Sequence, residues 1–99
     1  MAKIEETRTF PGKSPDQLYS AFESAYQKAG FNTWKKRPLG WLALAKRQEA
    51  DSDVQSTLSA RPGNPPAATL VITSEKQTQE QLQAWAVEIW KSLDETVLA

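Results

Sequence analysis

Residues 54–60 read Val-Gln-Ser-Thr-Leu-Ser-Ala, where apolar or small side chains alternate strictly with polar ones. Successive side chains of a β-strand point to opposite faces, so this alternation predicts a strand with one buried face. The following segment, 61–66, contains three prolines that fix φ and lack amide donors, and it therefore ends the strand. The buried side is predicted to consist of Val54, Ser56, Leu58 and Ala60.

Further strands are predicted on both sides of this segment. Downstream, residues 67–74 contain an apolar run typical of a strand. Upstream, residues 31–37 and 40–49 also approach a period of two, separated by the turn Pro38-Leu39-Gly40, and Asp51-Ser52-Asp53 offers a second turn. Four successive strands joined by short turns predict an antiparallel meander.

Two amphipathic helices are predicted, one on each side of the meander. Ser14-Pro15-Asp16-Gln17 combines an N-cap hydroxyl, a proline at the first helical position and a glutamine three residues after the cap, and Gly30 supplies a stop, so a helix covers 14–29. Thr78-Gln79-Glu80-Gln81 has the same capping pattern. The helix that it begins carries one apolar stripe, with Trp90 at its edge: Leu82, Trp85, Ala86, Ile89, Leu93 and Val97.

A first strand is predicted at 3–10, with Glu6 and Arg8 on its apolar side, which favours an edge position. The element order is then β-α-β-β-β-β-α in a single α+β domain, residues 1–99. Because each helix has one apolar stripe, both helices are expected on the same face of a mostly antiparallel sheet. This element order is similar to that of the helix-grip architecture, in which a curved sheet wraps a long C-terminal helix.

The composition favours a small folded domain without a global electrostatic field. Twelve basic and twelve acidic side chains give a net charge of zero, so nothing steers the whole protein towards nucleic acid or an anionic membrane. Leu, Ile, Val and Phe make up only about a fifth of the 99 residues, although four tryptophans and two tyrosines add buryable surface. We therefore expect modest stability, and a weak homodimer is one way to bury more surface.

The chain lacks the residues that most enzyme and metal sites require. It contains no cysteine and no histidine, which excludes disulfides, thiol nucleophiles, a Ser-His-Asp triad and the usual zinc sites. Glu49, Asp51 and Asp53 do not fit a calcium loop, because the glycine and glutamate that such a loop needs are absent. We expect a non-catalytic protein with no metal and no cofactor.

The N-terminus suggests where the protein is found. Residues 1–6 are charged and lack the apolar region of a signal peptide. The longest apolar runs, 41–45 and 67–72, are too short to span a bilayer. These features predict a cytoplasmic protein that does not associate with membranes.

The segment 34–47 is the strongest candidate for a contact surface, because aromatic rings lie among cations there. If Leu42 and Leu44 face the helices, then Trp41, Ala43, Ala45 and Arg47 face away from them, beside Thr57 and Ser59. The candidate binding residues are Trp34, Lys36, Arg37, Trp41, Lys46 and Arg47.

Three functions compete for these features. Protein association is favoured, because it needs no missing chemistry and suits a small neutral domain. Single-stranded nucleic acid could use the same surface, although the zero net charge and the missing RNA-binding aromatic pattern argue against it. An apolar small ligand could bind between the C-terminal helix and the sheet, in a cleft lined by Phe22, Tyr26, Trp85 and Trp90. A purely structural interpretation is also open: cations protect exposed sheet edges, and aromatic stripes usually belong to the core.

Overall fold

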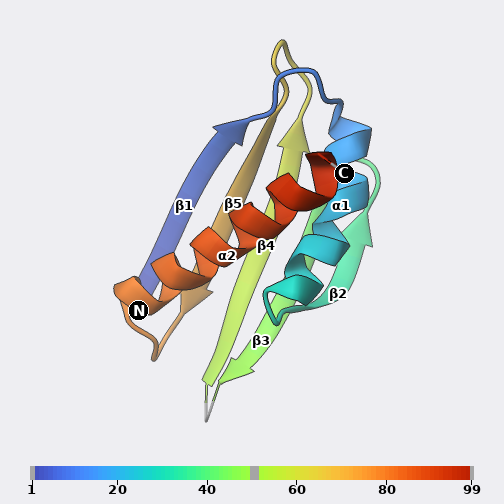
Figure 1. The fold of residues 1–99 in the computed structure, drawn as a ribbon. Coiled ribbons are helices and arrows are strands. Elements are labelled where there is room, and N and C mark those ends of the chain that lie inside the picture. The colour runs from blue at the N-terminus through green and yellow to red at the C-terminus, as the bar shows by residue number, and fades with distance from the viewer. Residues whose placement is uncertain (1, 50–51, 99) are drawn as a thin grey trace.

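The computed structural model describes residues 2–49 and 52–98, and it has the predicted order of elements. The strands and helices, in chain order, are β1 (Ala2–Thr9), α1 (Pro15–Lys28), β2 (Asn32–Arg37), β3 (Leu42–Glu49), β4 (Ser52–Arg61), β5 (Ala67–Ser74) and α2 (Gln79–Leu98). Figure 1 shows the strands as one curved sheet with the two helices across it.

The sheet is antiparallel throughout, and its strand order is β1-β5-β4-β3-β2. Strands β2 to β5 form the predicted meander, and β1 pairs with β5, the last strand along the chain. The two edges are therefore β1 and β2, which confirms the edge position predicted for the first strand. The predicted turn at 51–53 falls partly on Asp51, outside the described residues, whereas Ser52 and Asp53 already belong to β4.

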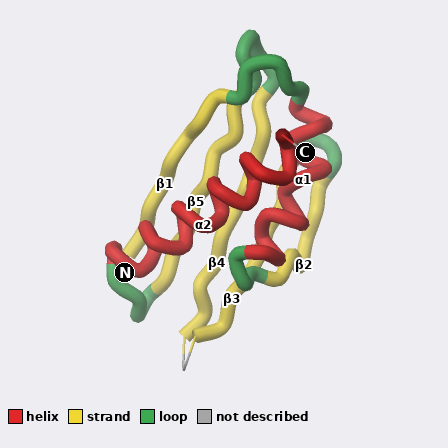
Figure 2. Tube along the Cα trace, in the orientation of Figure 1, coloured by secondary structure: helices red, strands yellow, loops and turns green. Residues whose placement is uncertain are grey.

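Both helices lie on the same face of the sheet, as predicted, and no other element among residues 2–49 and 52–98 covers the opposite face (Figure 2). Helix α1 contacts β2, β3 and β4, whereas α2 contacts β1 and β5 and packs along α1. We call the covered side the inner face and the uncovered side the open face. The predicted buried side of β4 is confirmed, since Val54, Ser56, Leu58 and Ala60 are all buried on the inner face.

The ends of the helices follow the capping signals in the sequence. The Ser14 hydroxyl accepts a hydrogen bond of 3.2 Å from the Gln17 amide, and the Gln17 side chain accepts one of 2.8 Å from the Ser14 amide. Gly30, with φ of +84°, follows the last turn of α1 in the left-handed conformation that glycine adopts most readily. At the start of α2, the Thr78 hydroxyl accepts a hydrogen bond of 3.1 Å from the Gln81 amide.

Candidate functional site

The orientation of β3 decides which side chains reach the open face. Ala43 and Ala45 are fully buried on the inner face, whereas Leu42 and Leu44 are only half-buried. The orientation predicted for β3 is therefore wrong. The register gives the reason: Ala43 pairs with Leu58 and Ala45 pairs with Ser56, both on the buried side of β4. Only small side chains fit there, because α1 and the aromatic rings that it carries pack closely over these strands.

Trp41, predicted to face away from the helices, instead packs against the core. It adopts a φ of 50° in the turn after Gly40, which is uncommon for a residue other than glycine. Its indole Nε1 donates a hydrogen bond of 2.8 Å to the carboxylate of Asp16 in the first turn of α1. Trp41 therefore joins the β2–β3 hairpin to α1.

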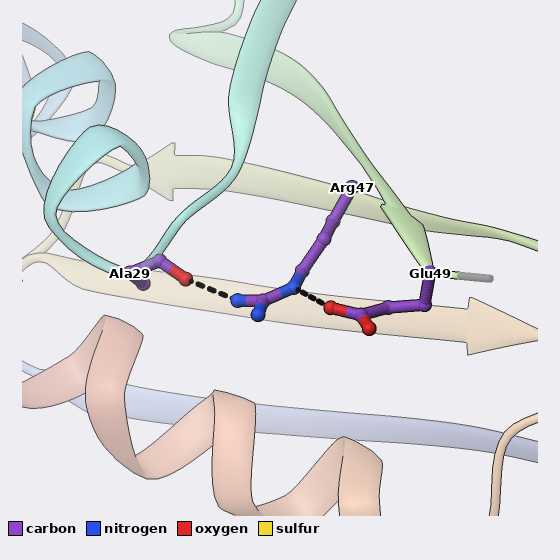
Figure 3. A network of polar contacts seen from close by, with 3 residues as sticks. All are labelled: Ala29, Arg47 and Glu49. Carbon is purple, nitrogen blue, oxygen red and sulfur yellow. Dashed lines mark hydrogen bonds and ion pairs between the residues drawn. The ribbon is translucent and has the colours of Figure 1, made fainter.

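Arg47 also lies on the inner face, contrary to the prediction. Its Nη1 donates a hydrogen bond of 2.9 Å to the carbonyl oxygen of Ala29, and its Nε pairs with the carboxylate of Glu49 (Figure 3). The guanidinium also lies 4.9 Å from the ring centroid of Trp85 on α2. These contacts give Arg47 a role in holding the helices on the sheet.

Trp34 is the exposed aromatic of the segment. The register of β2 against β3 shifts between Thr33 and Lys35, so Trp34 occupies an irregularity in the strand. Its side chain is 51% exposed, and the Nζ of Lys46 lies 5.0 Å from its ring centroid. Because Lys46 follows the inward-facing Ala45, this aromatic–cation pair lies on the open face.

The three cations of β2 divide between the two faces. Lys36 pairs with Ala43 on the inner side, and its Nζ lies 5.2 Å from the ring of Tyr19 on α1. Lys35 pairs with Leu44, and Arg37 pairs with Leu42, so both cations lie on the open face. One continuous surface thus consists of Trp34, Lys35, Arg37, Leu42, Leu44 and Lys46, and we call it the open-face patch. Leu42 and Leu44 were missed as site residues because the predicted orientation of β3 was wrong. Lys35 was missed because the sequence pattern did not determine which side chains of 31–37 point outward, and the register of β2 shifts just before Lys35.

The zero net charge conceals an uneven distribution of charge. Helix α1 carries two carboxylates and one lysine, and α2 carries four carboxylates and one lysine. Strands β2, β3 and β4 together carry six cations and two carboxylates. The helix layer is therefore acidic and this half of the sheet is basic, so the open-face patch attracts negative charge locally.

The aromatic residues predicted to line an apolar cleft form the core instead. Phe22 and Tyr26 are fully buried, Trp90 is 1% exposed and Trp85 is 6% exposed. Trp90 thus lies well inside the core rather than at the edge of the stripe. Phe31 packs between the helices, with its ring centroid 5.7 Å from that of Tyr26 and 6.1 Å from that of Trp85. The apolar-ligand alternative stays a prediction, but a ligand among these four side chains would have to displace them.

A hydrogen bond between two buried side chains lies within the core. The hydroxyls of Tyr26 and Ser56 are 2.9 Å apart and hydrogen bond to each other. Burial raises the pKa of the Tyr26 phenol above its ordinary value, whereas the hydrogen bond to Ser56 acts in the opposite direction. The phenol is therefore a structural hydrogen-bonding group at neutral pH.

Within residues 2–49 and 52–98, no three acidic side chains gather in a way that could hold a metal ion. Over those same residues, neither helix is long and apolar enough to cross a membrane.

Comparisons with known proteins show what the fold resembles. No family model matches the sequence, and no curated protein matches it. The structure is similar to that of a protein from Chromobacterium violaceum, with a TM-score of 0.67, 11% identity and coverage of 94% of this chain and 95% of that one. A protein from Thermus thermophilus gives a TM-score of 0.62 at 14% identity, covering 98% and 96% of the two chains.

A third similar structure, described as a START superfamily protein from Mycobacterium smegmatis, gives a TM-score of 0.57 at 12% identity. It covers 98% of this chain and 94% of that one. At such low identity these likenesses establish the fold and nothing further. The class is therefore an α+β domain of helix-grip type, as the element order predicted.

Proposed function

We propose that this chain is a small non-catalytic domain that binds an acidic segment of another protein through the open-face patch. One observation carries the proposal. Trp34, Leu42 and Leu44 are left uncovered by the helices, and three cations stand around them: Lys35, Arg37 and Lys46. An apolar centre with a charged rim is the usual anatomy of a protein–protein contact surface.

The patch suits a protein better than a nucleic acid. Single-stranded nucleic acid binds where several aromatic rings stack on successive bases, and this patch has one ring, Trp34, already covered on one side by Lys46. Leu42 and Leu44 add apolar surface that phosphates and sugars do not use. Aliphatic side chains on a partner protein would bury this apolar surface.

The partner's charge follows from the cations of the patch. Two copies of this chain meeting open face to open face would bring like charges together, which disfavours association in that geometry. Carboxylates on the partner would complement Lys35, Arg37 and Lys46. Because these cations are exposed, they should act on the affinity mainly through the association rate, and binding should weaken as salt is added.

The proposal keeps three of the residues predicted from sequence and sets three aside. Trp34, Arg37 and Lys46 belong to the open-face patch. The other three predicted residues contact helices on the inner face: Lys36, Trp41 and Arg47.

A photo-crosslinking amino acid at position 44, introduced in the cells that make the protein, tests the proposal. The matched control places the same group at Val87, which is 54% exposed on α2. The proposal predicts a discrete protein adduct from position 44 and none from position 87. The adduct protein, once purified, should bind the unlabelled domain and lose at least tenfold in affinity with Lys35→Glu/Lys46→Glu.

Three outcomes would contradict the proposal. An adduct that contains nucleic acid would support the alternative use of the same surface. An adduct with a second copy of the chain would identify a homodimer. Equal labelling from positions 44 and 87 would mean that the open-face patch has no special role.

A further inference from the structure

A hollow of about 300 Å³ lies between the last turns of α2 and the segment that leads from β1 to α1. Figure 1 shows this segment passing over the end of the sheet towards α1, close to the C-terminal end of α2. This volume is at the lower end of the range of pockets that bind small organic molecules. The hollow borders the core at Phe10 and lies on the opposite side of the sheet from the open-face patch.

One wall of the hollow is apolar. Phe10, Pro11 and Val97 line it, and Phe10 is 8% exposed, so its ring is held firmly in place. The Phe10 amide donates a hydrogen bond of 2.8 Å to the carbonyl of Pro66, and its ring centroid lies 6.4 Å from that of Trp90. These contacts fix the wall before any ligand arrives, which reduces the entropy lost on binding.

The lining of the hollow also contains charged side chains, and positive charge exceeds negative charge among them. Arg8 and Lys13 contribute two cations, and Asp94 contributes one carboxylate. The Arg8–Asp94 pair is loose, with Nη1 and Oδ2 3.9 Å apart and both side chains about half exposed: 49% and 46%. The guanidinium of Arg8 is held over the Trp90 ring at 4.9 Å and has five N–H donors in a planar fork that matches a carboxylate.

We propose that this hollow binds a small monoanion with an apolar body, of the class of medium-chain or aromatic carboxylates. The body would lie against Phe10, Pro11 and Val97, and the carboxylate would accept hydrogen bonds from Arg8 with Lys13 nearby. One negative charge on the ligand balances the one excess positive charge of the lining. A dianion or a cation would leave a net charge in the hollow.

Octanoate is the probe that tests this proposal, with octanol and octylammonium as matched controls of the same chain length. Binding to the full chain is measured by two-dimensional NMR, following the Trp90 indole, the Arg8 guanidinium and the Val97 methyl groups. We expect saturable shifts at all three groups with octanoate. Octanol should bind at least tenfold more weakly, and octylammonium should not produce the shifts.

Two variants locate the site, and a third serves as a control. Val97→Trp fills the hollow and should abolish the shifts at the Trp90 indole and the Arg8 guanidinium. Lys13→Gln should weaken octanoate binding severalfold with little effect on octanol. Lys28→Gln removes a cation from the far end of α1 and should change neither. Equal affinity for octanoate and octanol, no shift at millimolar octanoate, or unchanged binding by Val97→Trp in a folded spectrum would each overturn the proposal.

Discussion

The guanidinium of Arg47 donates a hydrogen bond of 2.9 Å to the carbonyl oxygen of Ala29, the residue that caps the C-terminal end of α1. The carbonyl groups at a helix C-terminus have no partners within the helix and carry partial negative charge. The Arg47 side chain from β3 therefore provides a hydrogen-bond donor for a carbonyl group at the end of α1. The same guanidinium contacts the ring of Trp85 on α2. One side chain ties both helices to the sheet.

Arg47→Met should lower the free energy of unfolding by about 2 kcal/mol, because it removes a charge-assisted hydrogen bond and leaves a carbonyl unsatisfied. Lys46→Met is the matched control, since the neighbouring cation lies on the open face, and its effect should stay within about 0.5 kcal/mol. Urea unfolding followed by circular dichroism measures both. Equal effects of the two substitutions would show that the inward orientation of Arg47 is wrong.

Gly30→Ala should lower the stability of the protein in two ways: alanine is strained at a positive φ, and its Cβ would clash with Arg47. A Cβ at position 30 would lie 2.6 Å from Nη1 of Arg47, in addition to the strain of a φ of +84°. Gly12 has nearly the same φ, +81°, but a Cβ at position 12 would have no neighbouring atom within 4 Å. Gly12→Ala should therefore cost about 1 kcal/mol and Gly30→Ala clearly more, as thermal unfolding would show. Equal costs would mean that Arg47 moves away freely.

Tyr26→Phe should cost about 1–2 kcal/mol, because it leaves the buried Ser56 hydroxyl without its partner. The double substitution Tyr26→Phe/Ser56→Ala should recover part of that loss, and a thermodynamic cycle of the four proteins measures the coupling. If the double variant simply shows the sum of the two single losses, the two hydroxyls do not interact.

The same phenol predicts how stability changes at alkaline pH. Its folded-state pKa is raised by burial, so its contribution to stability is fully present below the unfolded pKa, near 10.0, and is lost as the pH rises above that value. Wild-type stability should therefore fall between about pH 10 and 12, and Tyr26→Phe should show a shallower fall. Parallel pH profiles of the two proteins would contradict the assignment of Tyr26 as a buried titrating group.

Trp34→Ser and Leu44→Ser should leave the midpoint of thermal unfolding within about 3 °C of wild type, because both side chains lie on the open face. Leu58→Ser, at a fully buried position of β4, is the control that should unfold the protein or lower its midpoint by well over 10 °C. A large loss from either open-face substitution would assign that residue to the structure instead of to binding.

The fold could be predicted from sequence because its signals are local. Ser14 and Gly30 mark the ends of α1, and the alternation from Val54 to Ala60 gives the buried face of β4 directly. The element order and the placement of both helices on one face follow from these periodicities.

The site could be predicted only in part, because packing across the sheet decides which side chains of β3 point towards the helices and which point to the open face. By hydrophobicity alone, Leu42 and Leu44 are better core residues than Ala43 and Ala45. The small alanines are buried because the aromatic rings of Tyr26 and Phe31 already occupy the space above the sheet. The turn predicted at Pro38-Leu39-Gly40 extends to Trp41, whose positive φ has no signal in the sequence, so β3 begins at Leu42 and not at residue 40.

The role of the open-face patch can be tested by an NMR titration of the isotopically labelled domain with a synthetic peptide of alternating glutamate and leucine. We expect saturable shifts at the Trp34 indole and at the amides of Lys35, Leu44 and Lys46. These shifts should weaken as salt is raised, and a lysine–leucine peptide of the same length should not produce them. Shifts that cluster on α1 and α2, or none at millimolar peptide, would show that the open-face patch is not the contact surface.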